Sequence, residues 1–394
     1  MTTARTATPS TARAINDRLA LDLLLGQGPL TAPELRTLTG LSRPTVADLL
    51  ERLQRGGLVA VAGESGEQRR GPNARLYALV ADRAHLGAID VRSTGVNLVI
   101  ADLTGRSLAT AEIPAGPDHG DDLAERTVRA LLGAAEQVGA RELHTVAVGA
   151  PGVVDPATGV LNNSGQLPRW HTELLAVLRA QPGTEVILEN EVNLAGIAEH
   201  RIGAAQGRED FALLWLGHGV GASVVLNGRL RRGASGGTGE IGFLPVPGTG
   251  MLPTATGCDG GFHSLASSAA VCELARAHGL DVPDGGPVEQ AEAVVRVAVA
   301  EGREAFLDEL AGRIALGAAA ICVVIDPGCV VLGGEVGRAG GAELAARVER
   351  HLAGLSPFGT EVRAGTAGGG AVLAGAVLTA GDAVRRDLFG EPRG

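Results

Sequence analysis

Apolar positions in the first eighty residues recur with the spacing of short amphipathic helices. Ile15, Leu19 and Leu23 predict a first helix, and Leu35 and Leu38 give a shorter second helix its apolar side. A third helix is expected where four apolar residues share one face, namely Val46, Leu49, Leu50 and Leu53. The pattern therefore predicts three helices packed around one small core.

Signals between and after these helices complete a small domain. Gly40 tolerates the positive φ of a tight turn, Ser42 can cap the third helix, and Pro44 in the first turn of that helix needs no partner for an N–H. Strands are expected at residues 58–61 and 75–79, joined by a polar loop. Three helices followed by a β-hairpin are typical of a winged helix-turn-helix.

A winged helix predicts a surface that reads double-stranded DNA. The start of its third helix would enter a major groove, and the arginines of the hairpin loop would enter a minor groove or clamp phosphates. The expected contacts are Ser42, Arg43, Pro44, Thr45, Arg69, Arg70 and Gly71. The expected target is a palindromic operator, which implies a homodimer or a higher homo-oligomer.

From His85 onward the pattern changes to strands that alternate with helices, with a Gly-rich turn in each of two similar halves. This predicts an α/β chain, with the winged helix followed by a two-lobed, actin-like body that closes on a cleft. The expected division is a disordered tail at 1–12, a winged helix at 13–82, a small lobe at 83–188 completed by a C-terminal helix at 370–394, and a large lobe at 189–369.

Charge supports a DNA-reading head on an acidic body. The chain has a formal net charge of −10, which by itself argues against nucleic-acid binding. Residues 1–80, however, hold ten Arg against seven acidic residues, and the remainder holds 24 Arg against 37 acidic residues. A basic head and an acidic body suit a protein whose only contact with DNA is the head.

Cysteine use and hydropathy limit the location and the chemistry. The four cysteines form no C-x-x-C pair, and no apolar run approaches the length of a membrane span. With no signal peptide, the chain is expected to be cytoplasmic, with reduced thiols and no membrane contact. Trp170 could wall a ligand site, although a lone aromatic residue is more often part of a core.

Five motifs then follow in a fixed order along the body. They read G-A-P-G-V-V-D at 149–155, E-N-E-V-N at 189–193, G-H-G-V-G at 217–221, E-I-G-F at 240–243 and D-P-G-C-V-V-L-G-G at 326–334. Residues 12–394 thereby resemble the ROK family, which includes sugar kinases and winged-helix repressors. The head favours the regulator branch. The resemblance implies sugar contacts at Asn163, Asn190, Glu191 and Glu240, and Asn162 or Ser164 could take the place of Asn163.

Departures from the family pattern argue against kinase chemistry. Glu191 replaces the Asp that acts as general base in family kinases, and Phe243 replaces a His that contacts sugar and ligates zinc. Arg92 replaces a Gly of the first phosphate loop, and His218 replaces a hydroxyl residue of the second. The remaining loop residues read as vestigial phosphate loops: Asp90, Thr94, Gly217, Gly219 and Gly221. A base displaced by about 1 Å can cost roughly 100-fold in rate.

The region of the family's zinc motif is also degenerate. Cys258 is its single thiol, with Asp259 and His263 nearby, whereas structural zinc usually needs four nitrogen or sulfur ligands. We therefore expect neither a metal nor a cofactor, and we expect His263 at a helix start or in a loop.

Together these patterns predict a DNA-binding transcriptional regulator, a repressor of carbohydrate-utilisation genes that a sugar-type effector releases from DNA. The sequence leaves two alternatives open. One is a sugar kinase that retains a DNA-binding head, and the other is a ligand-independent regulator whose body only dimerises.

Overall fold

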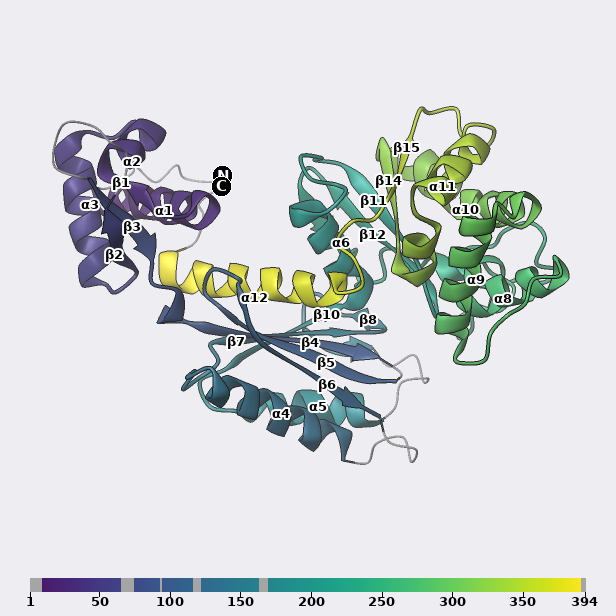
Figure 1. Ribbon diagram of the computed structural model, residues 1–394, viewed down its shortest axis with the longest axis horizontal. Helices are drawn as coiled ribbons and strands as arrows, with labels where there is room; N and C mark the ends of the chain where they lie inside the picture. Colours follow the sequence, from purple (N-terminus) through teal and green to yellow (C-terminus); the bar gives the residue numbers. More distant parts are fainter. Residues whose placement is uncertain (1–8, 65–73, 93, 116–121, 163–168, 391–394) are drawn as a thin grey trace.

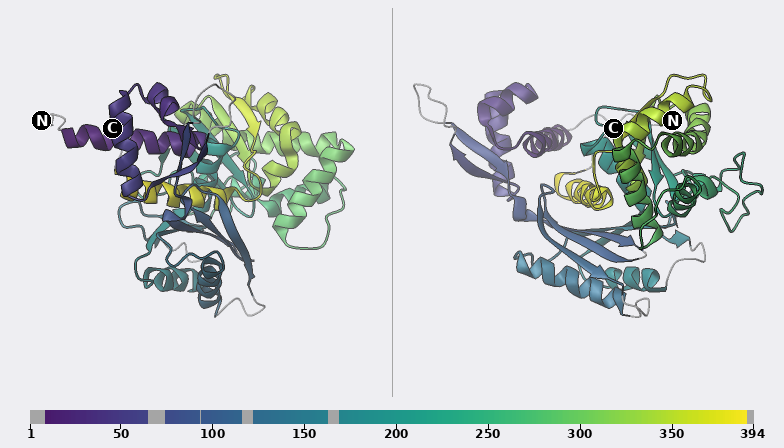
Figure 2. Two further views of the ribbon diagram at one scale, coloured as in Figure 1. Left: turned by 60° about the vertical axis from the view of Figure 1, so that its left-hand side comes forward. Right: turned by 45° about the vertical axis from the view of Figure 1, so that its right-hand side comes forward.

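The computed structural model describes residues 9–64, 74–92, 94–115, 122–162 and 169–390 of the chain. A small helical head lies beside one end of the long helix α12 (Ala371–Phe389), and the two lobes of the body lie along and beyond this helix (Figure 1). The two further views keep the same order of head, first lobe and second lobe (Figure 2).

The head is a winged helix-turn-helix, as predicted. Its elements are α1 (Pro9–Gln27), β1 (Leu30–Thr31), α2 (Ala32–Thr39), α3 (Arg43–Arg55), β2 (Val59–Glu64) and β3 (Arg75–Leu79). The three strands form an antiparallel sheet in the order β1-β3-β2. The predicted apolar face of α3 is fully buried. Its residues belong to one hydrophobic core that also includes residues of the body.

The buried side of α1 differs from the prediction. Ile15 is 52% exposed and Leu19 is 41% exposed, whereas Ala20, Leu21 and Leu24 are buried. Apolar residues occur on most sides of α1, so their periodicity alone does not determine which side is buried. The packing of α1 against α2 and α3 determines it. The helix also begins at Pro9, so residues 9–12, which were expected to belong to a disordered tail, are helical.

The first lobe is a five-stranded sheet covered on one face by α4 (Leu123–Gln137) and α5 (Arg169–Arg179) (Figure 1). Its strands are β4 (His85–Arg92), β5 (Gly95–Asp102), β6 (Ser107–Pro114), β7 (Thr145–Ala150) and β10 (Glu185–Asn190), after the 3₁₀ turn η1 (Ala81–Arg83). The order is β10-β7-β4-β5-β6, and β10, β7 and β4 run parallel. The short strands β8 (Val153–Val154) and β9 (Leu161–Asn162) pair beside it.

The second lobe repeats this plan with a larger helical layer. Its sheet has the order β13-β12-β11-β14-β15, formed by β11 (Phe211–Leu216), β12 (Val220–Leu226), β13 (Arg229–Arg231), β14 (Cys329–Gly333) and β15 (Glu361–Ala364). The other elements are η2 (Ile241–Phe243), α7 (His263–Ala266), α8 (Ser268–Ala277), α9 (Pro287–Glu301), α10 (Glu304–Ile325) and α11 (Gly334–Leu352). The two sheets are the lobes of an actin-like body.

The chain passes from the first lobe to the second and later returns, and each crossing contains a helix. The chain leaves β10 through α6 (Glu191–Ile202) and returns from β15 into α12, which packs on α6, β4 and β7. The two helices approach very closely at Gly375, where a β-carbon would lie 1.9 Å from the backbone oxygen of Leu194. Only a residue without a side chain allows this contact.

The two leucines of α2 give a direct test of which residues hold the head together. Leu35 is 1% exposed and Leu38 is 45% exposed. We expect Leu35→Ala to lower the free energy of opening of the head by about 2–5 kcal/mol, because it leaves a cavity. Leu38→Ala is the matched control and should change this free energy by less than about 0.5 kcal/mol. Hydrogen exchange of the α3 amides measures both, and equal effects would contradict the packing described here.

Candidate functional site

The turn between α2 and α3 is built by local capping. Thr31 and Glu34 form a reciprocal capping box at the start of α2, and Gly40 ends this helix with a φ of 70°. Ser42 caps α3 by accepting a hydrogen bond from the Thr45 backbone N–H at 3.4 Å, and the two hydroxyls lie 2.7 Å apart. The N-terminus of α3 is therefore fixed by residues that the sequence singled out.

The first turn of α3 is open to solvent. Ser42, Arg43 and Pro44 are exposed, and Thr45 is partly exposed. Among the described residues Arg43 makes no hydrogen bond or ion pair, whereas the acidic residues of this helix are paired with arginines one turn later. These pairs join Asp48 to Arg52 and Glu51 to Arg55. A free cation at the start of the helix and neutralised acids further along favour approach to a phosphate backbone.

The other predicted DNA contacts lie in the hairpin loop. Arg69, Arg70 and Gly71 fall outside the described residues, although the strands that carry their loop are in place. Their contact with DNA stays a prediction.

The second candidate site is the region between the lobes, at the ends of β4 and β10. Asp90 is buried at the end of β4, and its Oδ2 accepts a hydrogen bond from Nε of Arg92 at 2.7 Å. Burial raises the pKa of Asp90, and the guanidinium of Arg92 opposes this rise. Arg92 also donates to the backbone oxygen of Gly369 at 3.3 Å. The stretch that was predicted to be a vestigial first phosphate loop thus holds an internal ion pair, while Thr94 is exposed.

The three residues of the E-N-E stretch, at positions 189–191, make different contacts at the junction of β10 and α6. Glu189 is buried and accepts hydrogen bonds from Arg232 and from the side chain of Asn193. Asn190 caps α6, and its amide donates to the backbone oxygen of Gly152 at 3.0 Å. Glu191 has a buried Oε2 without a hydrogen-bond partner among the described residues. Asn190 thus has a structural task, and Glu191 is the member of this stretch with an unused polar atom.

The ionisation of Glu191 is strongly perturbed. Burial, together with the nearby carboxylates of Asp90 and Glu240, raises the pKa of Glu191 to about 8. Burial also raises the pKa of Glu240, which precedes the η2 turn that ends at Phe243. At neutral pH the carboxyl of Glu191 is mostly protonated, so it can donate a hydrogen bond as well as accept one.

The second Gly-rich loop is the tight turn between β11 and β12. Ser268 donates its backbone N–H to the oxygen of Gly217 at 2.9 Å. A β-carbon on Gly217 would lie 2.7 Å from Oε2 of Glu335, whereas one on Gly219 would meet open space. Gly221 lies against Val192 of α6. The carboxylate of Glu335 therefore lies close to this loop, and its negative charge would disfavour a phosphate there.

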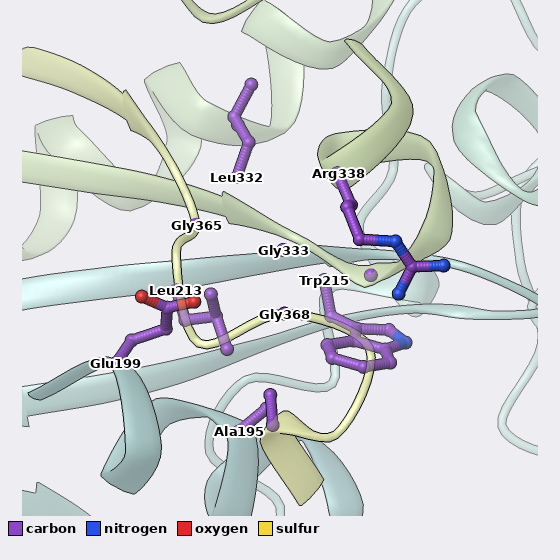
Figure 3. A pocket seen from close by; sticks show the side chains of 11 residues that line it. Ala195, Glu199, Leu213, Trp215, Leu332, Gly333, Arg338, Gly365 and Gly368 are labelled. Atoms are coloured by element: carbon purple, nitrogen blue, oxygen red, sulfur yellow. The ribbon is translucent and has the colours of Figure 1, made fainter. Parts of the chain in front are cut away.

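A small cavity lies beside Trp215, near the end of β11 (Figure 3). Trp215, Arg338 and Glu199 line it together with the Gly333–Gly334 turn and with Gly365 and Gly368. Its volume is about 20 Å³, which holds about one water molecule. Small-molecule sites usually measure about 300–1,000 Å³, so this space does not admit a nucleotide in the conformation described.

Several further candidates can be placed. Trp170 is buried in the first-lobe core, edge-on to His171, so it does not wall a ligand site. His263 begins α7, as expected. Cys258 is a free thiol, and the described part of the chain contains no group of three or more His, Cys, Asp or Glu residues arranged to hold a metal. Asn163 lies outside the described residues.

Three charged residues at the lobe junction were not predicted from the sequence. Glu189 and Arg232 join β10 to the loop after β13, and Glu199 of α6 accepts backbone hydrogen bonds from both crossings between the lobes. A carboxylate inside a buried strand, or on the apolar side of a helix, breaks the hydrophobic pattern. That break is the signal that could have identified Glu189 and Glu199.

The described part of the chain contains no helix that is long and apolar enough to cross a membrane.

Comparison with known proteins agrees with this architecture. The ROK family profile matches residues 86–382, and the MarR family profile matches residues 15–71. The chain is 25% identical to a glucokinase of Halalkalibacterium halodurans over 277 residues, which are 66% of this chain and 83% of the relative. It is 26% identical to the DNA-binding transcriptional dual regulator NagC of Escherichia coli over 246 residues, which are 59% of this chain and 58% of the relative.

Similarity also extends to a solved structure with the same order of head and body. The crystal structure of a ROK family transcriptional regulator, a homolog of the E. coli MLC protein, superposes with a TM-score of 0.72 at 19% identity. The alignment covers 96% of this chain and 98% of that one. This likeness supports the fold of the whole chain, head included.

The raised pKa of Glu191 predicts a pH-dependent stability. The folded chain binds this proton more tightly than the unfolded chain does, because the pKa rises from 4.5 to about 8. Stability therefore falls as the pH increases through this interval, and it levels off above it. We expect Glu191→Gln to match the wild-type chain near about pH 5 and to be more stable near about pH 8.5, by at most about 5 kcal/mol.

Urea unfolding at the two pH values measures this difference. Glu136→Gln, which changes an exposed carboxyl of α4, is the control and should behave like the wild-type chain at both. An equal stability of Glu191→Gln and the wild-type chain at the higher pH would show that Glu191 is not desolvated as described.

Proposed function

The chain belongs to the ROK family, and we propose that it is a DNA-binding transcriptional regulator, a repressor of carbohydrate-utilisation genes that a sugar-type effector releases from DNA. The observation that carries this proposal is the winged helix in front of the ROK body, with the first turn of α3 exposed and Arg43 unpaired among the described residues. A recognition helix needs this geometry to reach base edges in a major groove. The operator is a palindromic DNA duplex, read by a cytoplasmic homodimer or higher homo-oligomer.

The effector binds between the lobes, at Glu191, Glu240, Asn190 and Asn163. Glu191 supports this assignment most directly, because its Oε2 is buried and lacks a hydrogen-bond partner among the described residues. A protonated carboxyl can donate to one hydroxyl and accept from another, which suits a polyhydroxylated ligand. Asn190 contributes through its place at the cap of α6, directly before Glu191.

The body does not transfer phosphate. Arg92 takes the place of a Gly of the first phosphate loop and pairs with Asp90, and the Glu335 carboxylate lies near Gly217 in the second. Glu191 takes the position of the family base but holds its proton at neutral pH, so little of it is in the form that accepts a proton from a sugar hydroxyl. These features support an inactive kinase body, whereas the similarity to glucokinases supports the alternative of a kinase with a DNA-binding head.

Arg43 provides the test of DNA reading. With an operator selected by the full chain from a random DNA library, Arg43→Ala should weaken specific binding by about 1–3 kcal/mol and leave non-specific binding less affected. Arg229→Ala, which removes an exposed arginine of the body, is the control. Fluorescence anisotropy at fixed salt measures both. Failure of the wild-type chain to select any sequence from the library would contradict the regulator proposal.

A coupled assay of ATP turnover tests the inactive-kinase proposal. With glucose, N-acetylglucosamine, N-acetylmannosamine and xylose, we expect no sugar-dependent ADP release above that of a Glu191→Ala variant, because Glu191 is protonated and the charged side chains of Arg92 and Glu335 lie at the two phosphate loops. Sugar-dependent turnover that Glu191→Ala abolishes would instead favour the kinase with a DNA-binding head.

A further inference from the structure

Arg18 of α1 lies against the C-terminal end of α12. Its Nη1 donates to the backbone oxygens of Gly390 at 2.6 Å and Arg385 at 3.3 Å. Its guanidinium carbon lies 5.7 Å from the centroid of the Phe389 ring, and Asp22 orients it through a hydrogen bond of 2.9 Å. Carbonyl groups at a helix C-terminus carry partial negative charge and lack partners within the helix, so a guanidinium stabilises this end.

The opposite end of α12 reaches the region between the lobes. Gly369, two residues before the helix, accepts the hydrogen bond from Arg92. The preceding residues Thr366 and Ala367 donate their backbone N–H groups to the carboxylate of Glu199 at 3.1 and 2.9 Å. A change in the relative position of the lobes therefore acts directly on the start of α12.

Between these ends α12 is one uninterrupted helix of 19 residues, about 28 Å long. It packs closely on α6 and β7, because a β-carbon on Gly375 of α12 would overlap Leu194 of α6, and one on Gly149 of β7 would overlap Val372 of α12. Packed helices of this kind shift as units rather than bend. The helix can therefore carry a displacement from one end to the other.

The contact with Arg18 continues to the recognition helix. Asp17, the neighbour of Arg18 on α1, accepts hydrogen bonds from Arg52 of α3, the shorter of which is 2.6 Å. Arg52 lies on the helix whose first turn presents Arg43. Contacts thus run without a break from Arg92, through α12 and α1, to α3.

We propose that Arg18 and the C-terminal end of α12 form the joint through which the region between the lobes orients the DNA-binding head. The joint deepens the proposed function and rests on it, because the orientation of the head matters only if the head binds DNA. Arg18 is a positioning residue and touches neither DNA nor effector. An effector that changes the lobe arrangement shifts the start of α12, and the joint converts this shift into a new direction of α3.

Hydrogen–deuterium exchange of the full chain tests the joint without DNA or effector. Arg92→Gln removes the hydrogen bond to Gly369 that holds the start of α12 to β4. We expect it to accelerate exchange in α1 by at least about fivefold, the lower end of ordinary coupling between sites. Arg92→Lys, which keeps the charge beside Asp90, should have a smaller effect. In an Arg18→Gln background α1 already exchanges faster, and Arg92→Gln should add nothing. Unchanged exchange in α1 of a folded Arg92→Gln chain would overturn the proposal.

Operator binding gives the second readout. Arg18→Gln should weaken binding to the selected operator by at least about fivefold, and Arg18→Lys should restore part of this loss. Arg13→Gln, which removes the same positive charge at an exposed position of α1, is the matched control and should leave binding unchanged. Effects of Arg18→Gln and Arg92→Gln that add independently in the double variant would also overturn the joint.

The two readouts separate failure of the joint from failure of the proposed function. An α1 that responds to Arg92→Gln in a chain that binds no DNA would leave the joint in place and refute the regulator proposal. If α1 does not respond to Arg92→Gln in a chain that binds its operator, the joint is refuted and the regulator proposal stands.

Discussion

The close packing of α12 against α6 and the first-lobe sheet is the constraint on which the rest of the structure depends. The C-terminal end of α12 contacts Arg18 of the head, and Gly369, before the start of α12, contacts Arg92 at the lobe junction. Glycine at position 375 allows the backbone of α12 to approach that of α6, and apolar residues of the head, the first lobe and α12 form one continuous core. Head and body are therefore parts of one packed unit rather than domains on a free linker.

The region between the lobes is dominated by charges that satisfy one another. Arg92 pairs with Asp90, Arg232 pairs with Glu189, and Glu199 binds backbone N–H groups from both crossings. In this arrangement Glu191 stands apart, because its buried Oε2 has no partner among the described residues. A ligand that supplies the missing partner would relieve the cost of burying an unpaired polar group. This provides a physical reason for an effector to favour one arrangement of the lobes.

Much of the fold follows from local patterns, and the exceptions have a common cause. The face of α3, the turn at Gly40 and the cap at Ser42 are set by residues close in sequence, and each was predicted. The buried side of α1 was predicted wrongly, because its apolar residues permit several faces and contacts distant in sequence select one. The same limit applies to the site. The motif around Asn190 directed attention to the junction of β10 and α6. Only the folded chain shows that Asn190 caps a helix, that Arg92 pairs with Asp90 and that Glu199 binds segments of both crossings.

The regulator proposal can be tested by titrating the purified full chain onto DNA from its own upstream region, at fixed salt, with and without a panel of mono- and oligosaccharides. For a repressor that a sugar releases, we expect specific binding that one class of sugar weakens, since such an effector would favour a lobe arrangement in which the head no longer fits its operator. Specific binding that no sugar changes would contradict the proposed sugar effector and favour a body that only dimerises. Absence of sequence-specific binding, there and in a wider DNA library, would contradict the proposal that the chain is a DNA-binding regulator.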